Sequence, residues 1–93
     1  MLGAFNAVGE IDLLTAPALN AGIHDAIDRS DDALVAVDCS GVTFMDSSGY
    51  EVLVDATEYA ARRGHTLVIR NASRPCTRLF HAFADDAELR FDS

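Results

Sequence analysis

The chain has 93 residues and a formal net charge of −8, with seven arginines and no lysine. This length allows one domain, residues 1-93, and a hydrophobic content of 49% is enough to fill one core. The acidic charge argues against direct binding to nucleic acid or an anionic membrane surface, and favours protein partners with a basic or mixed-charge face, unless it serves solubility alone.

The apolar runs are too short to cross a membrane, because none approaches the roughly 18 residues that a bilayer requires. The N-terminus lacks the basic flank and apolar core of a signal peptide. Cys39 and Cys76 form no CxxC motif, so we expect them to be reduced residues of the core. These features together predict a cytoplasmic protein.

The first thirty residues predict a strand followed by a helix. Residues 2–11 alternate loosely, with apolar groups on both sides, as in a strand that is covered on part of both faces. Thr15-Ala16-Pro17 is typical of a helix start, in which Thr15 acts as the cap and proline is tolerated in the first turn. Apolar residues then follow at helical spacing as far as Ser30.

The middle of the chain predicts a buried strand, a short connection and a long helix. Residues 33–37 form a continuous apolar run, which is typical of a strand in a parallel sheet. Phe44 and Met45, in the connection, are expected to enter the core. The helix runs from about Ser47 to Arg63, where cationic residues and then Gly64 mark its end.

The last third repeats the alternation. Residues 66–70 predict another buried strand, and the loop 71–75 leads into a helix whose apolar face includes Cys76. Asp85-Asp86 is expected to break this helix, and the alternating residues 88–92 predict a short edge strand. The resulting order, β-α-β-α-β-α-β, indicates an α/β fold: a mixed, mainly parallel sheet of about four strands with three crossover helices.

The segment Phe44-Met45-Asp46-Ser47-Ser48-Gly49 places two serines at a strand-to-helix turn. Polar sites gather at the carboxyl ends of strands in open α/β sheets. A hydroxyl at such a helix start can cap the helix, bind an anion or carry a phosphate. A purely structural interpretation is that Asp46 or Ser47 merely caps the helix and Gly49 merely permits close packing.

Catalysis at this turn is disfavoured. A serine hydrolase elbow needs Gly-x-Ser-x-Gly, whereas Met45 precedes Asp46 here. The pattern gives no reason to place His24, His65 or His81 beside the serines. There is no phosphate-binding Gly-x-x-x-x-Gly-Lys motif either. The sequence therefore predicts a protein that is not an enzyme.

Carboxylates are expected around the turn. Glu10, Asp12, Asp38 and Asp46 are the candidates, and a metal site built from them is a minor alternative. A phosphate on the turn adds roughly −1.5 to −2 charge beside these groups, with no arginine close in sequence. Such a change would alter a binding face more than it would unfold a helix.

At this point the residues resemble the STAS domain, and more narrowly the bacterial anti-sigma-factor antagonists (anti-anti-sigma factors). The likeness spans nearly the whole chain, including the Asn71-x-Ser73 loop and the Leu79-Phe80 helix. Its most specific motif is Asp-Ser-Ser-Gly. The other segments that carry it are Gly9-Glu10-Ile11-Asp12, Thr15-Ala16-Pro17, and the run from Val35 to Val42.

The resemblance implies a regulator that binds an anti-sigma factor, often a serine kinase, and so releases a sigma factor. The kinase would phosphorylate Ser47, with Ser48 as second choice, and break the complex; a PP2C-type phosphatase would restore it. The domain itself would need no cofactor, since ATP belongs to the kinase. The partner-binding face would comprise Glu10, Asp12, Asp46, Ser47, Ser48 and Gly49.

One departure from the family concerns the N-terminus. Family members usually carry another strand before the Gly-Glu-Ile-Asp segment, and this chain is expected to lack that first strand. A partner or a second copy would then cover the sheet edge, so the oligomeric state is expected to be a monomer or a weak dimer.

Two other functions stay open. One is a STAS-type subunit of an ABC-type transporter, in which Ser47 is a contact residue. The other is small-ligand or nucleotide sensing at the turn.

Overall fold

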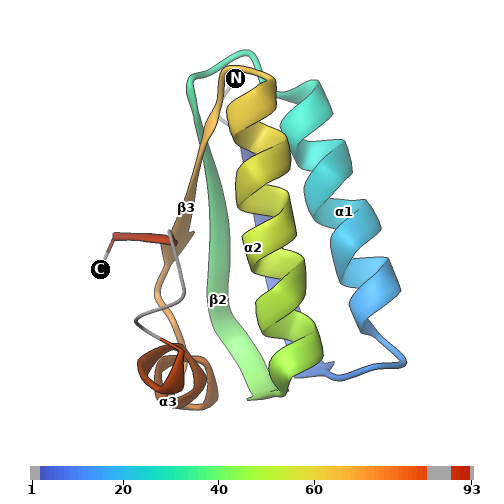
Figure 1. Ribbon diagram of the computed structural model, residues 1–93, viewed down its shortest axis with the longest axis vertical. Helices are drawn as coiled ribbons and strands as arrows, with labels where there is room; N and C mark the ends of the chain where they lie inside the picture. The colour runs from blue at the N-terminus through green and yellow to red at the C-terminus, as the bar shows by residue number, and fades with distance from the viewer. Residues whose placement is uncertain (1–2, 84–88, 93) are drawn as a thin grey trace.

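The computed structural model describes residues 3–83 and 89–92. These residues form four strands and three helices in the predicted alternating order (Figure 1). The elements are β1 (Gly3–Ile11), α1 (Ala16–Arg29), β2 (Leu34–Met45), α2 (Ser47–Arg62), β3 (Thr66–Arg70), α3 (Arg74–Ala82) and β4 (Arg90–Asp92).

The strands form one sheet in the order β1-β2-β3-β4, and each described pair of neighbours is parallel. Helices α1 and α2 lie side by side over one face of this sheet, and α3 lies near the carboxyl end of β3 (Figure 1). The α/β prediction with about four strands and three crossover helices is confirmed. The predicted edge strand exists as β4, and the expected helix break at residues 85 and 86 lies outside the described residues.

Strand β2 is longer than the sequence suggested. We expected a strand over 33–37 and a connection after it, but β2 continues without interruption to Met45. The prediction was wrong because Asp38, Ser40 and Gly41, which usually disfavour strands, lie at an irregularity in the β1–β2 register. Between the pairs Asn6↔Asp38 and Val8↔Gly41, β2 has one residue more than β1, which is the count of a β-bulge.

The core lies between the sheet and the helices. Its fully buried side chains come from the three helices and from the inward face of β2 and β3, and the buried residues among those described include no polar or charged one. The largest are Ile23, Ile27, Leu53, Leu67, Ile69, Val35 and Val37. None of the described helices is both long and apolar enough to span a bilayer.

Two helix boundaries follow from local chemistry. Gly64 has φ of +80° just after α2, as expected for a glycine that ends a helix. Pro17 stands in the first turn of α1, also as predicted, but the Thr15 side chain makes no capping bond to the helix. Thr15 therefore stands at the N-cap position, as predicted, but its hydroxyl is used in the preceding loop and not in a capping bond.

Candidate functional site at the carboxyl ends of the first two strands

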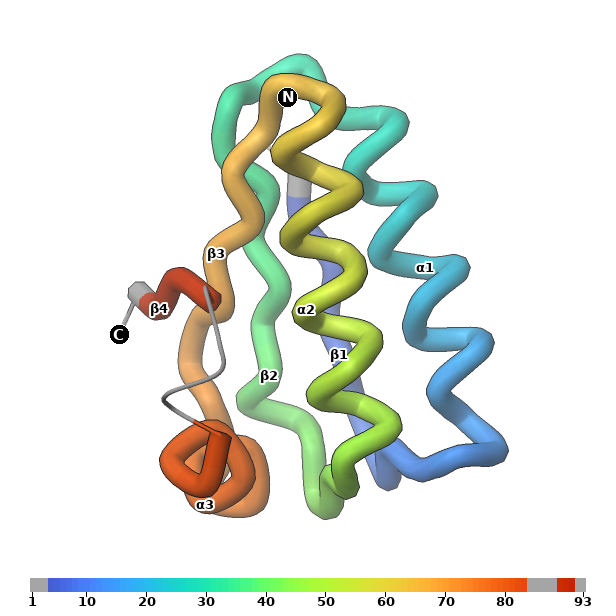
Figure 2. The backbone as a smooth tube through the Cα atoms, viewed as in Figure 1, coloured from blue at the N-terminus to red at the C-terminus, as the bar shows by residue number. Residues whose placement is uncertain are grey.

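The carboxyl ends of β1 and β2 lie next to each other. Glu10 is registered with Phe44 and Ile11 with Met45. The Asp46 N–H then donates to the carbonyl of Ile11 at 3.1 Å, which joins the start of the turn to the end of β1. Figure 2 shows the two chain segments meeting at the same end of the sheet, beneath the start of α2. The loop after β1 and the serine turn therefore form one surface.

Asp46 caps α2. Its backbone is extended, and its Oδ1 accepts the Ser48 N–H at 2.8 Å. Its carbonyl accepts the N–H groups of Gly49 and Tyr50 at 3.1 and 3.4 Å. A carboxylate at this position satisfies a free donor and meets the positive end of the helix dipole. The expected capping role is thus present, and Asp46 rather than Ser47 performs it.

Gly49 allows α2 to approach the sheet closely. A Cβ placed on this residue would lie 2.7 Å from Cγ2 of Ile11 and 2.8 Å from Cγ of Met45. Gly49 is buried, so it cannot itself touch a partner with a side chain. The structure thus gives Gly49 a packing role beneath the turn, and its place on a partner-binding face stays a prediction.

Ser47 is exposed at the first position of α2, whereas Ser48 is half-buried. The Ser48 backbone is engaged by Asp46. The hydrogen bonds found among residues 3–83 and 89–92 include none from the Ser47 hydroxyl, although they include several from threonine and tyrosine hydroxyls. Of the two serines in the turn, Ser47 is thus the one open to solvent.

The loop after β1 is held by Asp12 and Thr15. Asp12 Oδ1 accepts the N–H groups of Leu14 and Thr15 at 3.0 and 3.1 Å. The Thr15 hydroxyl donates to the Glu10 carbonyl at 2.9 Å and accepts the Asp12 N–H at the same distance. Asp12 is half-buried and shapes the loop, while the Glu10 side chain is exposed. The structure brings both acidic residues to the serine turn, as predicted.

Asp38 does not belong to this cluster. Its Oδ1 accepts the N–H and hydroxyl of Ser40 at 2.9 and 2.6 Å, and its Oδ2 accepts Asn71 Nδ2 at 2.9 Å. These donors, the Ser40 hydroxyl above all, hold the pKa of the Asp38 carboxyl below its usual range. Roughly 25 Å of extended β2 separates Asp38 from Asp46, so our expectation of a carboxylate here beside the phosphate was wrong.

Sequence reasoning missed an apolar rim around the turn. Leu13 and Leu14, in the loop after β1, are 76% and 88% exposed. Phe44 is 48% exposed, which corrects the expectation that it enters the core, whereas Met45 is buried as predicted. Phe44 and Glu10 are registered partners and so share one face of the sheet. The available signal was the Leu13-Leu14 pair, which stands outside the periodic pattern of either flanking element.

His24 and His65 have their contacts away from the serine turn. The His24 ring lies tilted against that of Tyr59 in α2, with ring centroids 4.1 Å apart, and His65 contacts the Asp32 carbonyl beyond the far end of α2. Among the described residues, no three histidine, cysteine or acidic side chains are placed to hold a metal ion.

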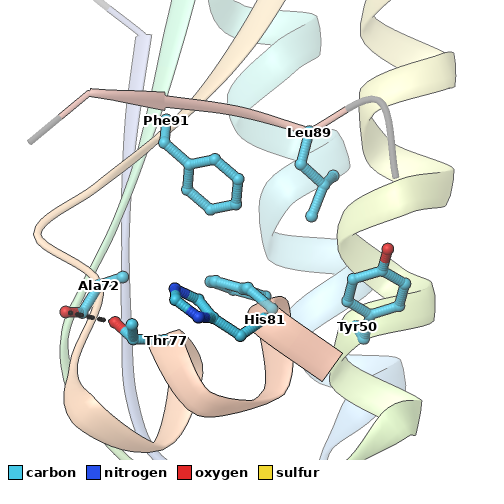
Figure 3. A pocket seen from close by; sticks show the side chains of 7 residues that line it. Tyr50, Ala72, Thr77, His81, Leu89 and Phe91 are labelled. Atoms are coloured by element: carbon cyan, nitrogen blue, oxygen red, sulfur yellow. Dashed lines mark hydrogen bonds between the residues drawn. The ribbon is translucent and has the colours of Figure 1, made fainter. Parts of the chain in front are cut away.

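A cavity of about 330 Å³ lies near the turn, between α2, α3 and the chain leading into β4 (Figure 3). Tyr50, which directly follows Gly49, lines it and donates its hydroxyl to the Phe83 carbonyl at 3.1 Å. The Thr77 hydroxyl, at the opposite wall, bonds the Ala72 carbonyl at 3.5 Å. The remaining lining is mainly aromatic or aliphatic: Phe80, His81, Leu89 and Phe91.

Comparison with known proteins identifies the family of this chain. The family model described as "Mlab, STAS domain" matches residues 3–89. The anti-sigma-B factor antagonist of Bacillus subtilis (strain 168) is 31% identical over 75 residues, which cover 81% of this chain and 67% of that protein.

Two solved structures share the fold. The unphosphorylated form of the anti-sigma factor antagonist SpoIIAA superposes with a TM-score of 0.73 at 18% identity, over 97% of this chain and 78% of that one, a likeness of fold alone. An anti-sigma factor antagonist from Mycobacterium paratuberculosis gives a TM-score of 0.78 at 28% identity, over 95% of this chain and 74% of that one. The chain therefore belongs to the STAS domain family, among whose members it matches anti-sigma factor antagonists.

Proposed function

We propose that this protein is an anti-sigma-factor antagonist. It binds an anti-sigma factor through the surface at the carboxyl ends of β1 and β2, and thereby releases a sigma factor. A serine kinase, which is the anti-sigma factor itself in the simplest case, phosphorylates Ser47 and ends the complex. A PP2C-type phosphatase reverses the mark.

The observation that carries the proposal is the exposed Ser47 at the first position of α2. Asp46 already caps the helix through its own side chain, so the Ser47 hydroxyl is not needed for capping. A phosphate at a helix N-terminus is also compatible with the helix dipole. The fold can therefore accept and lose the mark without local unfolding.

A phosphate on Ser47 would add negative charge to a surface that is already acidic. Asp46 precedes it directly, and Glu10 and Asp12 lie on the adjoining strand end. A further charge of roughly −1.5 to −2 raises the negative potential of a face that must otherwise meet its partner closely. A cost of about 4 kcal/mol is enough to weaken binding a thousandfold.

The apolar rim supplies the other half of an interface. Protein interfaces combine an apolar centre with polar groups around it. Leu13, Leu14 and Phe44 are exposed beside the carboxylates of the turn. Burial of these side chains would give affinity, and the acidic groups would select a basic or mixed-charge partner.

The names of the relatives support this role. The B. subtilis relative is an anti-sigma-B factor antagonist, and the SpoIIAA structure is described as the unphosphorylated form of such an antagonist.

The direct test is to incubate the protein with its cognate anti-sigma factor and ATP. We expect one phosphate on Ser47 by peptide mass spectrometry, together with loss of the complex by size-exclusion chromatography. Ser47→Ala should bind as tightly as the native chain and should stay bound after ATP is added. Phosphate on neither Ser47 nor Ser48 would overturn the switch.

Two alternatives give different results. In a transporter subunit, Ser47 is a contact and Ser47→Asp need not abolish assembly. In a ligand sensor, the aromatic cavity beside Tyr50 is the favoured site, since its volume and mostly apolar lining suit a small planar molecule. Calorimetric titration with ATP, ADP and GTP distinguishes a nucleotide sensor from an antagonist, because an antagonist is expected to show no heat of binding with any of them.

A further inference from the structure

We propose that the cavity beside Tyr50 is a binding site for a neutral bicyclic aromatic compound that carries one N–H or O–H group. None of the lining residues belongs to the proposed partner surface. The ligand site is therefore an addition to the antagonist role, and it exists whether or not that role is correct.

The cavity has the size of a bicyclic ring system. Its volume is about 330 Å³, whereas an apolar cavity of about 150 Å³ is enough to hold benzene. Small-molecule sites in proteins begin at about 300 Å³. In Figure 3, Leu89 and Phe91 point into the space from the chain at β4, and Tyr50 and His81 face it from α2 and α3.

The aromatic walls are held in place before any ligand enters. Tyr50 and Phe80 are each 6% exposed, and their ring centroids lie 6.3 Å apart. The Tyr50 ring also stacks on that of Phe83 with centroids 4.6 Å apart, and its hydroxyl donates to the Phe83 carbonyl at 3.1 Å. A ligand thus meets rings whose orientation is already fixed, which reduces the entropy lost on binding.

Phe91 is the wall that remains uncovered. Its ring centroid lies 5.2 Å from that of Phe80, with an angle of 51° between the planes, yet the residue is 54% exposed. Exposed apolar groups beside a cavity are typical of ligand-binding grooves. Tilted rings present both an edge and a face, which are the two surfaces that an aromatic guest contacts favourably. A flat ring placed here would bury Phe91.

The polar chemistry of the lining restricts the ligand further. Among the residues that the structure describes, the lining includes no aspartate, glutamate or arginine. A phosphate or carboxylate would therefore lose its hydration without gaining an ion pair with a carboxylate or guanidinium group of the wall. The Thr77 hydroxyl donates its proton to the Ala72 carbonyl at 3.5 Å, so its oxygen is left as an acceptor. It can accept one N–H or O–H from a neutral ligand.

The test uses indole as the probe and its fluorescence as the signal. The chain has no tryptophan, so emission excited beyond the tyrosine absorption band comes from indole alone. We expect saturable binding to the full chain with a dissociation constant of roughly 10 µM to 1 mM, accompanied by a blue shift of the emission. N-methylindole, which has no N–H, should bind about fivefold more weakly.

Two pairs of variants locate the probe. Phe91→Ala should weaken indole binding about tenfold, because it removes one wall. Leu34→Ala, at a residue of similar exposure (46%) on β2, should leave indole binding unchanged. Thr77→Val should abolish the preference for indole over N-methylindole. Thr57→Val is its control, since the Thr57 hydroxyl bonds the Leu53 carbonyl within α2.

Each outcome decides the proposal. No saturable binding to the native chain would overturn it, and so would tight binding to a folded Phe91→Ala protein. Equal affinities of the native chain for indole and N-methylindole would overturn the assigned ligand class. If Phe91→Ala does not fold, the comparison of Thr77→Val with Thr57→Val still decides. No anti-sigma factor or ATP is used, so a negative result here leaves the proposed function standing.

Discussion

The chain has two Asp-x-Ser-Gly segments, residues 38–41 within β2 and residues 46–49 at the start of α2, which use the same local bond and continue differently. In each, the aspartate Oδ1 accepts the N–H of the residue two positions later, at 2.9 Å for Ser40 and 2.8 Å for Ser48. The first segment continues as a strand through a bulge, and the second starts α2.

The residue after each aspartate shows what the surroundings add. Cys39 is fully buried, whereas Ser47 is exposed. Asp38 lies between β1 and β3, paired in register with Asn6 and Arg70, while Asp46 lies past the point where β3 has ended. The local pattern thus sets the aspartate bond, and the neighbouring strands decide whether the next side chain faces the core or solvent.

The largest expected effect is on partner binding, through the exposed Ser47 of the second segment. Ser47→Asp should weaken binding to the cognate anti-sigma factor by about 100- to 1000-fold, or roughly 3–4 kcal/mol, because a charge enters the contact face. Thermal stability should be unchanged or slightly higher, since a carboxylate is favourable at a helix start. Calorimetry and melting curves measure both. Ser48→Asp is the control, and it should lose less binding affinity. An unfolded Ser47→Asp protein would contradict the expectation that Ser47 affects binding and not folding.

Substitution of the buried Gly49 beneath the turn should change stability, whereas substitution of Ser47 changes binding. Gly49→Ala places a methyl against Ile11 and Met45, and it should lower the free energy of unfolding by about 1–3 kcal/mol. Urea denaturation measures this change. Ser47→Ala, two residues away and exposed, should stay within about 0.5 kcal/mol of the native chain. Equal stability of the two variants would show that the close packing is not needed.

Substitution in the apolar rim (Leu13, Leu14 and Phe44) should weaken binding to an intermediate degree and leave stability nearly unchanged. Leu14→Ser should weaken the complex by about 1 kcal/mol, or roughly fivefold, with little change in stability, because Leu14 is 88% exposed. Leu34→Ser is the matched control: Leu34 is an exposed leucine at the opposite end of β2. If both variants bind equally well, the rim lies outside the interface.

The smallest effect concerns Asp38 and is pH-dependent. The folded-state pKa of Asp38 lies below the ordinary value of 3.8, so its carboxylate stabilises the fold above that value. This contribution is lost as the pH falls through the folded-state pKa. The stability advantage of the native chain over Asp38→Asn should therefore shrink in that acidic range. Urea titrations at a series of pH values measure it, and a constant difference would contradict the assignment.

Local signals predicted most of the fold. Apolar runs, helical spacing and end signals such as Gly64 placed all seven elements in the right order. The serine turn was also predictable, since Asp46, Ser47 and Gly49 act within a few residues of one another. Glu10 and Asp12 could be placed beside it because parallel strands end at the same edge.

The misses depend on contacts between distant parts of the chain. The bulge that carries β2 past Asp38 requires its partner strand, and the exposure of Phe44 depends on the register after that bulge. The Asn71–Asp38 hydrogen bond joins residues 33 positions apart, on β2 and in the loop after β3. None of these is encoded by spacing along the sequence.

Helix α2 also has a practical consequence for measurement. It spans 16 residues, or about 24 Å, with Ser47 at one end and exposed Arg62 at the other. A surface tether or a dye attached at Arg62 therefore stands a full helix length from the serine. Immobilisation at that end leaves the turn free, so kinase action and partner exchange can be followed in real time on one anchored molecule.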